Sequence, residues 1–223
     1  VYPQNEMVIA INQCERFQPD GYIWDVESKF DSGTNAIQNA KLISKGLRAS
    51  FPNLSQALCW WALPKNPDNL AAEWHPVKVA KAWIDNVDIV MPMMYWGGET
   101  SYSALGYLLK SLRVWDSIIP ASFPMIPVGR SYTGDGGTIN SSAIFDFATR
   151  VFELRSTRNI CGISWWSLDA AYKDTSSWEA LVRTPKFVEE IVLELSMLSV
   201  EEILTRLVNY HRDLFPDLYK KVE

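Results

Sequence analysis

Residues 21–30 read GYIWDVESKF, and this stretch is the first sign of how the chain is built. An apolar run breaks at its end into two acids, Asp25 and Glu27, which are one residue apart. Charged groups at the end of a buried strand are costly unless they are solvated, paired or used. Because side chains alternate along a strand, both acids point to the same side, about 6.6 Å apart along the strand.

Four more apolar runs follow at regular intervals. Each is apolar on both faces, which is typical of a parallel strand covered by helices on one side and by core on the other. Successive runs begin 32 to 38 residues apart, as expected for a repeated βα unit. The predicted strands are residues 21–27, 56–63, 88–96, 124–132 and 162–169.

Segments beside these runs have helical spacing of apolar residues. They predict helices at 3–17, 34–51 and 141–155, of which the second has Ser32 or Thr34 as its N-cap. The residues predicted to face the core are Met7, Ile11, Cys14 and Phe17 in the first helix, Ile37, Ala40, Ile43 and Leu47 in the second, and Ile144, Phe147, Ala148, Val151 and Leu154 in the third.

The βα period predicts an α/β fold, specifically part of a (β/α)8 barrel. A complete barrel takes about 250 residues, or about 31 for each unit. On that count residues 21–27 are the fourth strand, residues 1–182 hold the last five units, and about three units are expected before Val1. An open doubly wound sheet is the alternative, but no Gly-rich nucleotide loop follows any predicted strand. Residues 183–223 are predicted to be a helical tail or connector.

Composition excludes several classes of protein. The chain has 223 residues, 48% of them hydrophobic and 21% charged, which indicates a sizeable core. A net charge of -5, with both signs scattered along the chain, offers no basic surface for nucleic acid, and no apolar stretch approaches the roughly 20 residues of a membrane span. The three cysteines, Cys14, Cys59 and Cys161, lack C-x-x-C spacing and are predicted to be buried apolar residues. With two histidines, we predict no metal and no cofactor.

The two acids suggest a reaction. Active sites of parallel α/β folds lie at the carboxyl ends of the strands. Glycoside cleavage needs one carboxylic acid to protonate the leaving oxygen and a second group to stabilise or attack the anomeric carbon. We assign Glu27, the outer residue, as general acid. Asp25 then orients Glu27 or positions an acetamido group of the substrate.

Aromatic residues are concentrated at the same strand ends, where they suit the apolar faces of sugar rings. Alternation lets only one of Trp60 and Trp61, and one of Trp165 and Trp166, face inward, and it turns Trp24 toward the helices. Arg130 is either a donor to the substrate or the partner of a barrel carboxylate. The candidate substrate-binding residues are Trp61, Tyr95, Trp96, Arg130, Trp166 and Asp169.

The motifs DVE, VMPMMYW and GISWWSLD together resemble the TIM-barrel glycoside hydrolases. The resemblance is greatest to the lysozyme-like muramidases of family 25 and their uncharacterised bacterial relatives, and more distant to the chitinase-like family 18. It implies an Asp-x-Glu on the fourth strand, matched by Asp25 and Glu27, an aromatic end of the sixth strand, matched by Tyr95 and Trp96, and a tryptophan on the eighth, matched best by Trp166. Muramidases carry further acids on the first strand and near the sixth. Near the sixth strand this chain offers only Glu99.

These observations lead to two hypotheses of different class. The first is a glycoside hydrolase of the extracellular space or cell envelope, acting on a β-linked amino-sugar polymer, peptidoglycan before chitin. The second is a non-catalytic glycan-binding or scaffold protein with a degenerate barrel. A third, a barrel enzyme for phosphorylated metabolites, lacks the Gly-rich phosphate loop. Since an incomplete barrel exposes strand edges, we also expect an N-terminal segment or another chain to complete it.

Overall fold

A computed structural model of the chain describes residues 2–27, 30, 33, 35–64, 76–97, 103–133 and 139–184. Residues up to Ala180 form one compact unit, and a second unit begins at Leu181. Within the described residues no helix is long and apolar enough to cross a membrane. The predicted tail lies outside the described residues from position 185 onward.

The elements are α1 (Pro3–Phe17), β1 (Gly21–Asp25), α2 (Ala36–Ser50), β2 (Ser55–Trp61), α3 (Val77–Ile84), β3 (Ile89–Met94), α4 (Ala104–Asp116), β4 (Val128–Arg130), α5 (Ser141–Leu154), β5 (Ser164–Trp166) and α6 (Leu168–Lys173).

The five strands form one parallel sheet in the order of the sequence, β1-β2-β3-β4-β5. All five predicted strands are confirmed, although each is shorter than predicted. The fourth is shortened most, to Val128–Arg130, and before it Met125 makes two isolated bridges, to Val90 and to Ile160. Pro124 and Pro127 explain the gap, because neither can donate a backbone hydrogen bond to a sheet.

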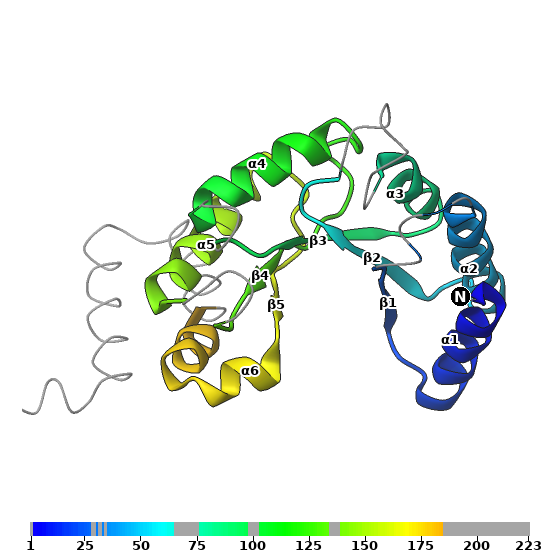
Figure 1. Ribbon diagram of the computed structural model, residues 1–223, viewed down its shortest axis with the longest axis horizontal. Helices are drawn as coiled ribbons and strands as arrows, with labels where there is room; N and C mark the ends of the chain where they lie inside the picture. The colour runs from blue at the N-terminus through cyan, green and yellow to red at the C-terminus, as the bar shows by residue number, and fades with distance from the viewer. Residues whose placement is uncertain are drawn as a thin grey trace, which may run out of the picture. The chain divides into compact units, whose positions relative to one another are not determined.

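The sheet is curled and the helices lie around its outer side, so the architecture is an α/β half-barrel. Figure 1 shows α1 to α5 in an arc around the strands. Each of these helices connects or precedes neighbouring parallel strands, as in βα units. The coarse prediction of a barrel-type α/β fold is therefore confirmed for the part of the chain that the structure describes.

The predicted helices are present as α1, α2 and α5. Most of the predicted core residues pack as expected, with Cys14, Ala40, Ile43 and Leu47 buried in α1 and α2. The prediction was wrong for Phe17, which is 66% exposed, and for Ile37, which is 38% exposed. Both residues lie at the end of a helix, where less of the neighbouring structure covers them. The residue that precedes α2 is Asn35; Ser32 and Thr34 lie outside the described residues.

A buried polar contact ties the outer face of the sheet to the helices. The Trp24 indole nitrogen donates to the Gln56 side-chain oxygen at 2.9 Å, and the Gln56 amide nitrogen donates to the Ser44 carbonyl of α2 at 3.4 Å. The Trp24 ring also lies 5.5 Å from that of Trp83 in α3. Trp24 therefore faces the helices, as its phase in the strand predicted.

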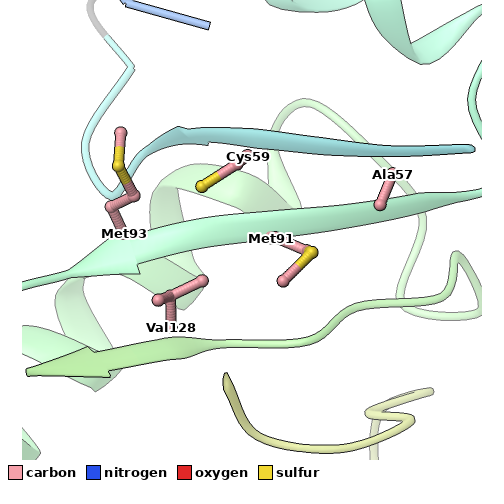
Figure 2. Packing of buried hydrophobic residues seen from close by; sticks show 5 residues of the cluster. All are labelled: Ala57, Cys59, Met91, Met93 and Val128. Carbon is pink, nitrogen blue, oxygen red and sulfur yellow. The ribbon is translucent and has the colours of Figure 1, made fainter. Parts of the chain in front are cut away.

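The inner face of the sheet carries a separate apolar cluster, made of Ala57 and Cys59 from β2, Met91 and Met93 from β3, and Val128 from β4. Figure 2 shows these five side chains gathered across the three strands. Of the three cysteines, Cys14 and Cys59 are buried as predicted, but Cys161 is exposed. It lies between α5 and β5, outside any strand, so the strand-core argument does not apply to it.

Gly129 provides a test of the packing between the sheet and α5. An added Cβ at Gly129 would lie 2.4 Å from the Trp165 ring and 2.9 Å from the Phe147 ring, whereas one at Gly162 would meet nothing within 4 Å. We expect Gly129→Ala to lower the free energy of unfolding by about 1–3 kcal/mol because two packed rings must move. Gly162→Ala, the matched control, should stay within about 1 kcal/mol of the wild type. Denaturant titration measures both, and equal stabilities would contradict the packing described.

Candidate active site

Asp25 lies at the carboxyl end of β1, directly opposite Cys59 of β2 in the parallel register. The two residues pair across the strands, and each affects the proton affinity of the other. The residue as a whole is exposed, but its carboxyl is partly enclosed by neighbouring strands. This desolvation raises the pKa of Asp25 above its ordinary value, and the neighbouring Cys59 thiol lowers it by a smaller amount.

Glu27 lies two residues beyond the end of β1, not on the strand as predicted. The ladder between β1 and β2 makes its last described bond from the Val26 N–H to the Cys59 carbonyl, at 3.2 Å. Val26 is buried and Glu27 is exposed. The charge of Glu27 nevertheless raises the pKa values of Cys59 and Tyr95, so its carboxylate lies near both. The two acids therefore lie in the same region at the end of β1, although Asp25 is in the strand and Glu27 is in the loop after it.

Tyr95 follows β3 and extends this region across the sheet. It is half-buried and packs against the inner apolar cluster. Burial is the main reason why the pKa of its phenol is raised, and the charges of Cys59, Asp25, Tyr132 and Glu27 add to the effect. The Tyr95 and Tyr132 rings meet edge-on at 6.4 Å. Tyr95 is consequently a neutral phenol at ordinary pH and keeps a hydroxyl group that can donate a hydrogen bond.

Arg130 ends β4 and is 1% exposed, although arginine is rarely buried this deeply. Its guanidinium lies 6.0 Å from the centre of the Tyr132 ring, within cation–π range. Ring contacts thus connect Tyr95 through Tyr132 to Arg130. The choice between a substrate donor and a partner of a barrel carboxylate stays a prediction for Arg130.

The tryptophan pairs divide between the two faces of the sheet as alternation predicted. Trp61 packs against the inner cluster, whereas Trp60 is fully buried. The Trp165 ring packs against that of Phe147 in α5, with 5.6 Å between the ring centres. Trp166 pairs with Arg130 in the parallel register and is 51% exposed. The peptide bond that follows Trp166 is cis. Trp61 and Trp166 are therefore placed where a ligand at the strand ends can reach them.

Trp96 does not join this group. Its ring is 4% exposed and stacks on Phe147 of α5 with 4.9 Å between the ring centres. The alternation that turns Tyr95 inward turns Trp96 outward. Trp96 instead lines a cavity of about 690 Å³ together with Arg130 and residues of α4 and α5. Neither Asp25 nor Glu27 lines this cavity, so we locate the candidate site on the inner face.

The remaining predicted site residue is Asp169. Its backbone lies in α6, and its side chain falls outside the described part of the chain. Within the described residues no group of three His, Cys, Asp or Glu side chains is placed to hold a metal ion.

Two residues of this region, Cys59 and Tyr132, were not among the predicted site residues. Cys59 was interpreted only as a small apolar residue. Its spacing of two from Trp61 was the available signal, because that spacing puts both side chains on the inner face. Tyr132 likewise lies two residues after Arg130, and this spacing predicts that their side chains point to the same face. What the sequence could not show is the lateral register that puts Cys59 beside Asp25.

Chemically, the described side chains at the strand ends are suited to proton transfer. A carboxyl group with raised proton affinity, Asp25, lies near a second carboxylate, Glu27, and beside two neutral donors, the Cys59 thiol and the Tyr95 phenol. Groups with shifted proton affinities at the carboxyl ends of parallel strands are typical of active sites.

Comparison with known proteins identifies the fold. No known family and no curated protein matches the sequence. Solved structures do match: a chitinase from Chromobacterium violaceum ATCC 12472 has a TM-score of 0.55 and 13% identity, over 80% of this chain and 70% of that one. A GH18 chitinase from Pseudoalteromonas aurantia has a TM-score of 0.56 and 14% identity, and the match covers 82% of this chain and 69% of the chitinase chain. The Bacillus megaterium QM B1551 spore cortex-lytic enzyme SleL has a TM-score of 0.55 and 15% identity, and the match covers 80% of this chain and 52% of the SleL chain.

At these identities the matches concern the fold alone, and that fold is the one seen in TIM-barrel glycoside hydrolases. The predicted barrel-type fold is thereby confirmed, and membership of this superfamily stays a prediction. The nearer resemblance to family 25 stays a prediction. This chain spans about half of the SleL chain.

The raised pKa of Asp25 predicts a pH-dependent stability. A carboxyl whose pKa is higher in the folded state contributes stability at low pH and loses that contribution as the pH rises through the folded pKa. Asp25→Asn removes the partly desolvated charge, so we expect this variant to be more stable than the wild type at about pH 7 and the difference to shrink toward about pH 3.

Denaturant titrations at several pH values measure this effect. Glu15→Gln, on the exposed surface of α1, is the matched control and should follow the wild type throughout. An Asp25→Asn variant whose stability parallels that of the wild type at every pH would show that the carboxylate is not desolvated in the folded state.

Proposed function

We propose that this chain is a glycoside hydrolase of a β-linked amino-sugar glycan, with Glu27 as general acid and Asp25 as the assisting carboxylate. The observation that supports this most is the convergence of the two carboxylates with Tyr95 at the strand ends. Trp61 and Trp166 add aromatic surface at the same ends, and the fold is that of TIM-barrel glycoside hydrolases.

In the proposed reaction the Glu27 carboxyl donates its proton to the glycosidic oxygen, and the bond from this oxygen to the anomeric carbon breaks. The positive charge that develops on the sugar is stabilised by an oxygen of the substrate acetamido group, which Asp25 holds in position. Water then adds to the anomeric carbon and returns its proton to the Glu27 carboxylate. The reaction therefore begins with the Glu27 carboxyl protonated, and it uses Asp25 only to orient the acetamido group.

The substrate class is proposed from the solved neighbours. Two of them are named as chitinases and one as a spore cortex-lytic enzyme. A chitinase from Pyrococcus furiosus, with a TM-score of 0.52, was solved with chito-oligosaccharides. We therefore propose peptidoglycan or chitin as substrate, and the extracellular space or cell envelope as the place of action. Trp61 and Trp166 are the proposed stacking surfaces, and Arg130 is a further proposed binding residue.

Replacing the proposed acid tests the function directly. We expect Glu27→Gln to lower the rate of glycan hydrolysis by about 10²–10⁴-fold, because the amide cannot donate the required proton to the leaving oxygen. Glu27 is exposed, so the thermal melt of the variant should match that of the wild type. Release of reducing ends from peptidoglycan and from chito-oligosaccharides is the measurement.

Glu15→Gln serves as the control and should retain full activity. Undiminished activity of Glu27→Gln would refute the assignment of the acid. Glycan binding by the wild type without any release of reducing ends would instead favour the non-catalytic glycan-binding scaffold.

We also propose that further parallel βα units pack against β1 and continue the barrel. Among the described strands, β1 is an edge with β2 as its neighbour, and Ile23 on its inner face is 55% exposed. On α1, which precedes this strand, Val8 and Ile9 are also exposed. An open parallel edge with apolar side chains beside it favours pairing with another strand.

This proposal predicts how the 223-residue chain behaves alone. We expect it to self-associate, because no described strand pairs with the free side of β1 and Ile23 is exposed. Ile23→Thr should reduce the self-association. Light scattering after size exclusion measures the molecular mass, and a monomeric 223-residue chain would refute the proposal. Recovery of a monomeric, cooperative species on adding a second polypeptide would indicate a separate partner chain.

A further inference from the structure

Ser111 is a small polar residue on the buried face of α4. The buried residues of this helix recur at helical spacing and are Ala104, Tyr107, Leu108, Ser111, Leu112 and Trp115. Ser111 is 0% exposed. A hydroxyl group is costly to bury unless it is hydrogen-bonded, so the partner of Ser111 indicates what this residue contributes.

The partner lies in another part of the chain, directly after β2. The Ser111 hydroxyl donates to the carbonyl oxygen of Ala62 at 2.7 Å, across a separation of 49 residues. Ala62 is also 0% exposed, and a buried backbone carbonyl needs a hydrogen-bond partner. This contact is therefore a buried hydrogen bond that attaches α4 to the end of β2.

The hydrogen bond lies where β2 extends beyond β1. The register between these two strands ends at the pair of Asp25 and Cys59, and their last described backbone bond runs from Val26 to the Cys59 carbonyl. Trp61 is paired with Met93 of β3. Among the described strands, the end of β2 therefore has a neighbour on one side only. Ser111 attaches the next residue of the chain to a helix.

Trp61 is the side chain that this attachment affects most directly. Its ring packs against the inner apolar cluster and stays partly exposed. Because Trp61 and Ala62 are consecutive, a change in the backbone at Ala62 also turns the Trp61 side chain. A fixed strand end keeps the ring in one orientation before a ligand arrives, and a surface that is ordered in advance loses less freedom on binding.

We infer that Ser111 is a positioning residue for Trp61. By holding the Ala62 carbonyl against α4, it fixes the end of β2 and the aromatic surface on which a sugar ring stacks. The effect on sugar binding rests on the proposed function, whereas the anchoring of the strand end does not. Since Trp61 is proposed to contact the sugar and not to transfer protons, Ser111 contributes to substrate binding more than to the chemical step.

Ser44 of α2 provides a matched control. It is also 0% exposed, and its hydroxyl donates to the Ala40 carbonyl at 2.7 Å. That carbonyl belongs to the same helix and lies four residues earlier, where it also accepts the ordinary helical bond. Ser44→Ala therefore removes a hydroxyl of equal burial without releasing a strand end.

Hydrogen exchange tests the anchoring without any assay of activity. We expect Ser111→Ala to speed the exchange of the backbone amides of residues 59–63 by about tenfold, the effect of roughly one lost hydrogen bond to a buried group. Residues 21–25 of β1 should keep the wild-type rate, and Ser44→Ala should change neither segment. Unchanged exchange at 59–63 in Ser111→Ala, or an equal rise in both segments, would overturn the inference.

A double-mutant cycle on hydrolysis tests the role in binding. With chito-oligosaccharides and soluble peptidoglycan fragments, Ser111→Ala should raise KM by about three- to tenfold and leave kcat within about twofold, while Ser44→Ala changes neither. In a Trp61→Leu background, Ser111→Ala should alter KM by less than about twofold, because the ring that it positions is absent.

The outcomes separate the inference from the proposed function. Equal effects of Ser111→Ala with and without Trp61 would refute the positioning role, as would an unchanged KM in an active Ser111→Ala variant. A wild type that hydrolyses neither substrate would count against the proposed function, and hydrogen exchange at residues 59–63 would still decide whether Ser111 anchors the end of β2.

Discussion

The alternation of side chains along parallel strands is the constraint on which the rest of this structure depends. One set of side chains is covered by helices, as Trp24 is by Trp83 of α3 and Trp96 is by Phe147 of α5. Because that layer is apolar and tightly packed, a strand cannot slip by one residue without burying the wrong set. The inner set, which includes Asp25 and Tyr95, is thereby directed to the concave face.

The electrostatics of the candidate site follow from the same constraint. Parallel register brings Cys59 beside Asp25, and the apolar cluster beneath them reduces the water around both groups. Partial desolvation then raises the proton affinities of Asp25, Cys59 and Tyr95 together. A site built this way costs stability at neutral pH, which is a usual property of catalytic groups. The outer helices supply the packing that offsets this cost.

Much of the fold could be predicted because its signals are local. The five apolar runs and the stripes of α1, α2 and α5 recur at periods that only one kind of α/β unit satisfies. Strand ends were less predictable: Pro127 shortens β4, and β1 ends at Asp25 before it reaches Glu27. The phase of each strand predicted correctly that Trp61 and Trp166 face the inner side of the sheet, whereas their role in a site stays a prediction. Trp96 was a poor candidate because the prediction treated neighbouring aromatic residues as equivalent, although they face opposite sides.

By itself the sequence determined the period, the class of the fold and the position of two acids at and just after the end of the first described strand. Each of these depends on spacing within a single segment, so no knowledge of other segments is needed. Only the tertiary structure decided that Cys59 lies opposite Asp25, that Tyr95 and Tyr132 extend the region toward a buried Arg130, and that β1 is an open edge among the described strands. Lateral register and burial arise from contacts between segments far apart in the chain, which no local pattern encodes.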